Sequence, residues 1–78
     1  MPTVLRVGRY RFFFYSSDQN EPMHVHIEAE GKIAKVWLDP IRLENSGGFN
    51  RSGITRILSI IMKHQVELME SWNGYFGN

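Results

Sequence analysis

The apolar periodicity of this 78-residue chain changes once, near Asn50, and that change limits the fold more than any other feature. Before it, short runs alternate polar and apolar residues, as is typical of β-strands. After it, apolar residues recur at i, i+3, i+4 and i+7, which predicts an amphipathic α-helix. Since the strands all precede the helix, we expect an α+β fold. A mainly antiparallel sheet of four to five strands should carry one long C-terminal helix packed on one face.

The predicted elements form a single compact domain over residues 1–78. Strands are expected at about 3–7, 10–15, 23–30 and 32–38, and 41–44 is either a short fifth strand or an edge segment. The helix is expected at about 51–73, with Asn50 as its N-cap. A two-residue turn at Glu30–Gly31 would pair Ala29 with Lys32, although a slip of one residue in this register stays open.

Composition excludes several classes of site and location. The chain has no cysteine, which rules out disulfides and cysteine-based zinc sites. A formal net charge of +1 does not indicate bulk attraction to nucleic acid or to an anionic membrane. No apolar run approaches the ~20 residues of a membrane span, and the first residues do not resemble a signal peptide. We therefore expect a cytoplasmic protein.

The stretch around His24 and His26 concentrates the titratable chemistry of the chain. A polar loop over 16–22 leads into it, and loops that feed such a strand often carry function. In a strand, His24, His26 and Glu28 share one face, while the aliphatic residues between them share the other. The aliphatic side is expected under the helix. The histidine face should therefore be exposed, toward solvent or a partner.

An acid–base site for RNA is one interpretation of this face. In the expected register Lys35 lies beside His26, and Trp37 lies beside His24. One imidazole could take the proton of a ribose 2′-hydroxyl while the other protonates the leaving oxygen. The candidate catalytic residues are therefore His24, His26 and Lys35. The candidate ligand-binding residues, which would hold phosphate or stack on a base, are Arg11, Tyr15 and Trp37.

Two other interpretations of the same face stay open. His24, His26 and Glu28 could chelate one metal ion, since imidazole and carboxylate are common ligands. No Asp-x-Asp or His-x-x-x-His motif accompanies them, so no metal or other cofactor is predicted. The polar face could also be solvated and without a specific role.

The apolar end of the helix suggests a protein contact. Trp72, Tyr75 and Phe76 would lie past the sheet if the helix were straight, because about 22 residues span ~33 Å. They either fold back on the sheet or meet a second chain. Aromatic residues are frequent interface anchors, and a small chain without disulfides gains stability from a partner.

Several segments together resemble a small bacterial family labelled domain of unknown function 4160. They are Thr3-Val4-Leu5-Arg6, Tyr10-Arg11-Phe12-Phe13-Phe14-Tyr15-Ser16, His24-Val25-His26, Ala34-Lys35-Val36-Trp37-Leu38, Gly48-Phe49-Asn50 and Trp72-Asn73-Gly74-Tyr75-Phe76-Gly77. The family typically reads Pro-Pro-His-Val-His, and here Met23 replaces the second proline. Its members resemble stand-alone small proteins, often encoded beside another small domain in an arrangement similar to toxin–antitoxin pairs. The resemblance supplies no catalytic residue.

Residues and resemblance together predict a toxin–antitoxin-type component that binds or cleaves RNA through an exposed His-x-His strand face. The alternative is a non-enzymatic interaction module that dimerises or binds a neighbour-encoded protein through Trp72, Tyr75 and Phe76. Whether the chain is an enzyme stays open, and no membrane contact is expected.

Overall fold

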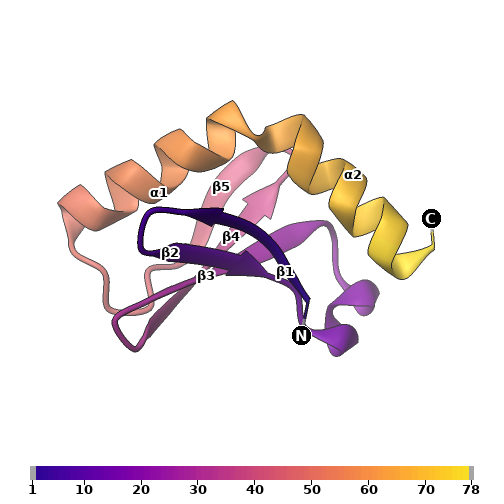
Figure 1. Cartoon of the computed structure of the whole chain (residues 1–78), viewed down its shortest axis with the longest axis horizontal. Helices are drawn as coiled ribbons and strands as arrows, with labels where there is room; N and C mark the ends of the chain where they lie inside the picture. Colours follow the sequence, from indigo (N-terminus) through magenta and orange to yellow (C-terminus); the bar gives the residue numbers. More distant parts are fainter. Residues whose placement is uncertain (1, 78) are drawn as a thin grey trace.

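A computed structural model describes residues 2–77 as an antiparallel sheet with two helices (Figure 1). The five strands follow one another in space as in sequence, so the sheet is a meander. They are β1 (Thr3–Val7), β2 (Tyr10–Phe13), β3 (His24–Ala29), β4 (Lys32–Leu38) and β5 (Ile41–Asn45). A short 3-10 helix, η1 (Ser16–Asn20), joins β2 to β3. The α+β class is as predicted, and the segment after Pro40 is a true fifth strand paired with β4.

The central hairpin has the predicted register. Ala29 pairs with Lys32, and the ladder continues to His24 opposite Trp37. Glu30 and Gly31 both have positive φ, 54° and 77°, as a two-residue type I′ turn requires. Because side chains alternate along a strand, this register fixes which residues of β3 and β4 face the helices.

The prediction of one long helix over 51–73 is wrong. The structure has α1 (Arg51–Lys63) and α2 (Gln65–Phe76), separated at His64, where ψ is 18°. The N–H of His64 donates to both Ile60 and Ile61, and the Gln65 side chain donates to the Leu38 carbonyl at 2.7 Å. The break lets both helices follow the curved sheet (Figure 1), which a straight rod could not do.

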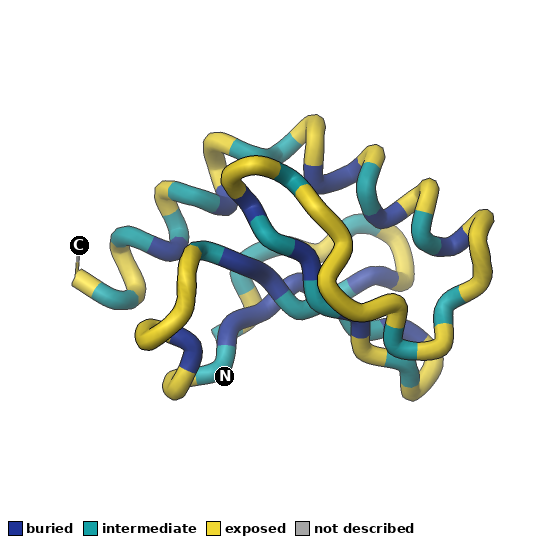
Figure 2. The backbone as a smooth tube through the Cα atoms, turned by 180° about the vertical axis from the view of Figure 1, so that it is seen from behind, coloured by how far each residue is buried: buried dark blue, intermediate teal, exposed yellow. Residues whose placement is uncertain are grey.

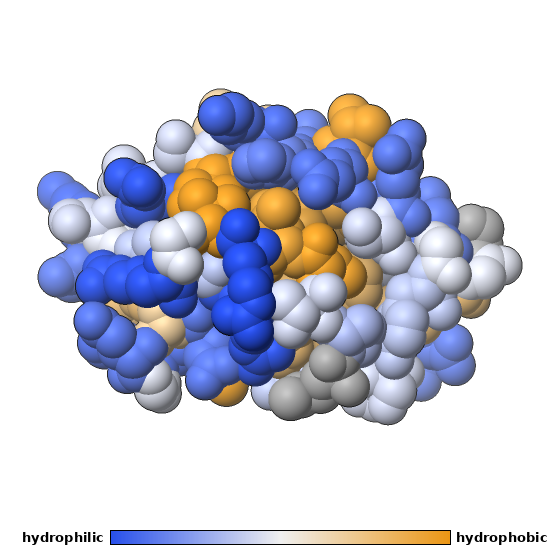
Figure 3. Space-filling view, viewed as in Figure 1, coloured by the Kyte–Doolittle hydropathy of each residue, from blue (hydrophilic) through white to orange (hydrophobic). Residues whose placement is uncertain are grey.

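Both helices bury their apolar sides against the same face of the sheet (Figure 2). The strands contribute Tyr10, Phe12, Val25, Ile27, Ala29, Ala34, Val36 and Leu38 to this core, and the helices contribute Ile57, Ile60, Ile61, Leu68 and Trp72. Asn50 is the N-cap of α1, as predicted, and its side chain accepts the Gly53 N–H at 2.8 Å. Figure 3 shows apolar side chains gathered where β1 meets the helices.

The aromatic end of α2 folds back on the domain. The ring of Trp72 is buried and meets Phe14 edge-on at 5.3 Å between centroids. Phe76 packs on Trp72 at 4.4 Å, while Tyr75 is exposed. Of the three predicted interface residues, Trp72 therefore belongs to the core. Within residues 2–77, none of the helices is long and apolar enough to cross a membrane.

Candidate functional site

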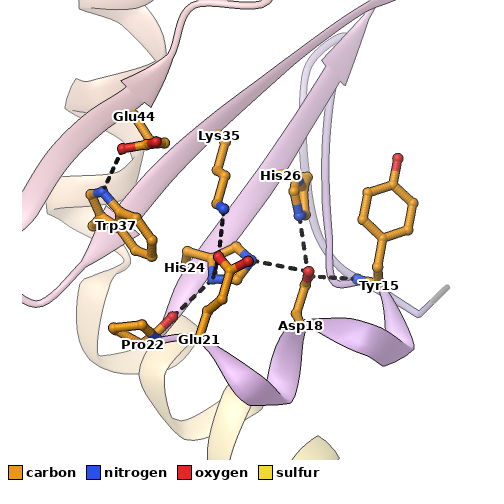
Figure 4. Close-up of polar contacts among 9 residues, drawn as sticks. All are labelled: Tyr15, Asp18, Glu21, Pro22, His24, His26, Lys35, Trp37 and Glu44. Atoms are coloured by element: carbon orange, nitrogen blue, oxygen red, sulfur yellow. Dashed lines mark hydrogen bonds and ion pairs between the residues drawn. The ribbon is translucent and has the colours of Figure 1, made fainter.

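The polar loop before β3 places Asp18 under the two histidines (Figure 4). Most of the loop forms the 3-10 helix η1, and Asp18 Oδ2 accepts a hydrogen bond from the backbone N–H of Tyr15 at 2.8 Å. This bond turns the carboxylate inward, where it is only 9% exposed. A buried carboxylate needs partners, and here they come from β3.

His24, at the start of β3, is fully buried. Its ring is 0% exposed and lies near the rings of Trp37 and Trp72, at 5.4 and 5.2 Å. Its Nδ1 is 2.8 Å from the Pro22 carbonyl and must donate, because a carbonyl oxygen only accepts. Its Nε2 lies 3.1 Å from Asp18 Oδ1 but makes no hydrogen bond. The expectation that both histidines face solvent is therefore wrong for His24.

His26 lies nearer the surface, with 11% of its side chain exposed. Its ring stacks on Phe13 at 5.5 Å and meets Tyr15 edge-on at 4.6 Å. Its Nε2 is 3.1 Å from Asp18 Oδ2. Burial lowers the pKa of His26, and the Asp18 charge opposes part of that shift. The lowered pKa favours the neutral ring, whose Nε2–H would donate to Asp18.

Lys35 and Trp37 lie beside the histidines, where the predicted register puts them. Lys35 Nζ pairs with Glu21 Oε1 at 2.6 Å and lies 4.8 Å from the centre of the Trp37 ring. The hydrogen bond from Lys35 lowers the pKa of Glu21. Trp37 Nε1 donates to Glu44 at 3.0 Å. Through these contacts, both side chains pair with carboxylates on this face of the sheet (Figure 4).

Glu28 shares the face of the histidines on β3, but its side chain pairs with Arg11. The two residues are opposite one another on β3 and β2, and Arg11 Nε donates to Glu28 Oε1 at 3.1 Å. The guanidinium also lies 4.4 Å from the centre of the Phe13 ring. The carboxylate of Glu28 is thus paired with the Arg11 cation. The carboxylate that lies next to the histidines is that of Asp18.

Asp18 is the residue of this candidate site that the sequence did not indicate. It lies in a loop, so no strand or helix period relates it to His24 and His26. A usable signal was its position three residues after Tyr15, where a carboxylate can cap the first turn of a helix.

The arrangement of these three side chains favours metal binding over acid–base chemistry by two histidines. His24 cannot reach a large substrate, so the pair cannot flank a ribose phosphate as predicted. Asp18, His24 and His26 instead offer three donor atoms within 4.8 Å of one another. Imidazole and carboxylate groups converging in this way are able to hold a metal ion.

Comparison with known proteins identifies the family to which this chain belongs. No curated protein and no solved structure matches the chain significantly. One family model, described as "Domain of unknown function (DUF4160)", matches residues 10–73. The matched range covers β2 to β5, η1, the whole Asp18–His24–His26 cluster and most of both helices. The resemblance seen in the motifs is confirmed: this chain belongs to the DUF4160 family, a family of unknown function.

Proposed function

We propose that this chain binds single-stranded RNA as one component of a toxin–antitoxin-type pair. The binding surface would be the open face, defined as the sheet surface opposite the helices that carries Arg11, Tyr15, His26, Lys35 and Trp37. One observation carries the proposal: this face carries two half-buried rings and two cations together with His26, with Tyr15 against its ring and Lys35 opposite it on β4. Sheet surfaces with accessible rings and nearby cations are a common platform for unpaired bases.

The burial of His24 favours binding over cleavage by two histidines. An imidazole that is 0% exposed can neither remove a 2′-hydroxyl proton nor protonate a leaving oxygen. His26 is the histidine of the pair that can meet RNA. Its ring is held by Asp18 on one side and by Phe13 on the other.

The ion pairs predict a weak dependence of binding on salt. Arg11 and Lys35 already pair with Glu28 and Glu21, so a phosphate would have to displace a carboxylate. With two phosphate contacts on a single strand, the slope of log K against log salt should be about −1.4. Stacking on Tyr15 and Trp37 would then supply most of the affinity.

Fluorescence anisotropy with a labelled single-stranded RNA tests the proposal. Tyr15→Leu should weaken binding by about 5- to 150-fold, because a stacked base contributes about 1–3 kcal/mol. Tyr75→Leu is the matched control, since Tyr75 is an exposed tyrosine on α2. Thermal melting of both variants shows whether the fold is kept. Equal affinities for the two variants, or no binding by the wild type, would reject an RNA site on the open face.

Growth assays test the toxin–antitoxin part of the proposal. Expression of the wild type should arrest a bacterial host, and co-expression of the neighbour-encoded protein should restore growth. His26→Gln should relieve the arrest, and His64→Gln should not, because His64 lies at the helix junction. Unimpaired growth with the wild type would argue against a toxin role.

Self-association is a second candidate, favoured by exposed apolar residues on the helical layer. Met62 and Val66, four positions apart, are each 67% exposed. Met62 also lines a groove of about 570 Å³ with Leu58 and with Leu43 on edge strand β5. A second copy could cover this surface through an isologous contact. Size-exclusion chromatography should then show a dimer for the wild type and a monomer for Val66→Lys, whereas a monomer at high concentration would reject this candidate.

A further inference from the structure

We propose that Asp18, His24 and His26 form a zinc site, with Nε2 of each imidazole and a carboxylate oxygen of Asp18 as ligands. The site goes beyond the proposed RNA binding and does not depend on it. It rests on an unsatisfied buried nitrogen, on the spacing of the donor atoms and on the groups that fix the ligands.

The first argument is the Nε2 atom of His24. Nδ1 carries the ring proton for the Pro22 carbonyl, so Nε2 of the neutral ring has a free lone pair. Among the described residues 2–77, it is the buried side-chain nitrogen that lacks a hydrogen-bond partner. Its nearest charged neighbour, Asp18 Oδ1 at 3.1 Å, is itself an acceptor. Two acceptors this close in a buried position require a cation or a proton, and a metal ion would satisfy both.

The second argument is the spacing of the donor atoms. The distances from Asp18 Oδ1 to His24 Nε2 and from Asp18 Oδ2 to His26 Nε2 are both 3.1 Å. Zinc–nitrogen and zinc–oxygen bonds of about 2.0–2.2 Å in a tetrahedron place their donors roughly 3.3–3.6 Å apart. The three donor atoms also lie within 4.8 Å of one another. Small side-chain adjustments would therefore complete the coordination.

The third argument is that neighbouring groups orient each of the three proposed ligands. The Pro22 carbonyl accepts from Nδ1 of His24, which is how metal-binding histidines are commonly oriented. The Tyr15 N–H holds Asp18 Oδ2, and Phe13 holds the His26 ring by stacking. Since each ligand is positioned by a neighbour, little side-chain entropy would be lost on binding.

The donor set selects the class of metal. Two imidazoles and one carboxylate suit zinc and similar first-row divalent ions, whereas magnesium and calcium prefer oxygen ligands. Three protein ligands leave the fourth position to water, as in exchangeable or catalytic zinc sites. Binding would replace the hydrogen bond from His26 to Asp18, and the proton of the neutral His26 ring would move from Nε2 to Nδ1.

Isothermal titration of EDTA-treated protein with zinc chloride tests the site. We expect saturable 1:1 binding and no competition from magnesium. Asp18→Asn and His26→Gln should raise the Kd for zinc at least about tenfold. Glu28→Gln and His64→Gln are matched controls and should bind like the wild type, because Glu28 pairs with Arg11 and His64 with Glu67.

NMR of the wild-type protein keeps the proposal testable if the variants unfold. Zinc should shift the Nε2 resonances of His24 and His26 and leave those of His64 unchanged. At a free zinc concentration about 100-fold above Kd, the Tm should rise by on the order of 10 °C. Shifts at His64 alone, or the absence of saturable binding by the wild type, would overturn the assignment.

Discussion

Within residues 2–77, histidine and carboxylate side chains meet at the start of β3 and at the helix junction, and the first of these places resembles a site. At the helix junction, His64 Nδ1 lies 2.9 Å from Glu67 Oε1, with 26% and 54% of the two side chains exposed. Below β3, His24 and His26 lie 3.1 Å from Asp18, and these side chains are 0%, 11% and 9% exposed. The distances are alike, so burial rather than distance separates the two places.

The difference follows from how each contact is formed. His64 and Glu67 are three residues apart at the start of α2, so local helix geometry alone brings them together. Asp18 reaches His24 and His26 only because η1 folds against β3. An exposed local pair contributes little, whereas a buried non-local cluster orders a whole loop. The predictions below test that contrast.

The largest effect is expected from removing the buried carboxylate of Asp18, compared with the exposed carboxylate of Glu67. Asp18→Ala should lower the free energy of unfolding by about 3 kcal/mol, because Tyr15 N–H and His26 Nε2 would lose a buried acceptor. Glu67→Ala should cost no more than about 0.5 kcal/mol. Urea denaturation with EDTA present measures both. Similar losses of unfolding free energy in the two variants would show that burial does not make the Asp18 cluster more important for stability than the His64–Glu67 pair.

Lowering the pH should also destabilise the buried cluster in metal-free protein. The pKa of His26 is lowered by burial, so the folded state binds fewer protons than the unfolded state, whose histidines titrate near about 6.5. Stability should therefore fall as the pH drops below about 6.5, down to the lower pKa of the folded protein. Denaturation at a series of pH values measures the slope. His26→Gln should flatten it, and an unchanged slope in that variant would assign it to other groups.

Glu28→Gln should have a smaller effect and sharpen the choice of ligand. Its carboxylate accepts from Arg11 on the open face, and the pair is partly exposed, so about 1 kcal/mol or less should be lost. Strand alternation alone made Glu28 the third candidate ligand. Chemical denaturation gives the loss of stability. A loss as large as that of Asp18→Ala would show that the Arg11–Glu28 pair stabilises the open face as much as the contacts of Asp18 do.

Much of the fold could be predicted from alternation and period. Residues with period two predicted the strands and the side that lies under the helices. The register of the β3–β4 hairpin was predicted from the two-residue turn at Glu30–Gly31. The break at His64 could not be predicted, because the apolar pattern continues across it without proline or glycine. It depends on the curvature of the sheet and on the contact from Gln65 to Leu38, which are tertiary features.

The candidate site was only partly predictable for the same reason. His24, His26, Lys35 and Trp37 come from one hairpin, so alternation was enough to group them. Two contacts do not follow from the spacing of residues within a strand or helix. Asp18 reaches the histidines from η1, and α2 places the ring of Trp72 5.2 Å from that of His24. Burial of His24 is therefore a property of the packed molecule, and a strand pattern alone assigns that residue to the exposed face.

The smallest effect is expected at the helix junction itself. His64→Ala removes the contact with Glu67 but keeps the backbone N–H that donates to Ile60 and Ile61. Because that backbone contact and the Gln65 bond to Leu38 hold the break, the unfolding free energy should change by at most about 0.5 kcal/mol. Gln65→Ala should cost more, about 1 kcal/mol, since it leaves a part-buried carbonyl unsatisfied. If His64→Ala were the more damaging of the two, the imidazole would itself hold the junction, and exposure would no longer separate the two places where histidine meets carboxylate.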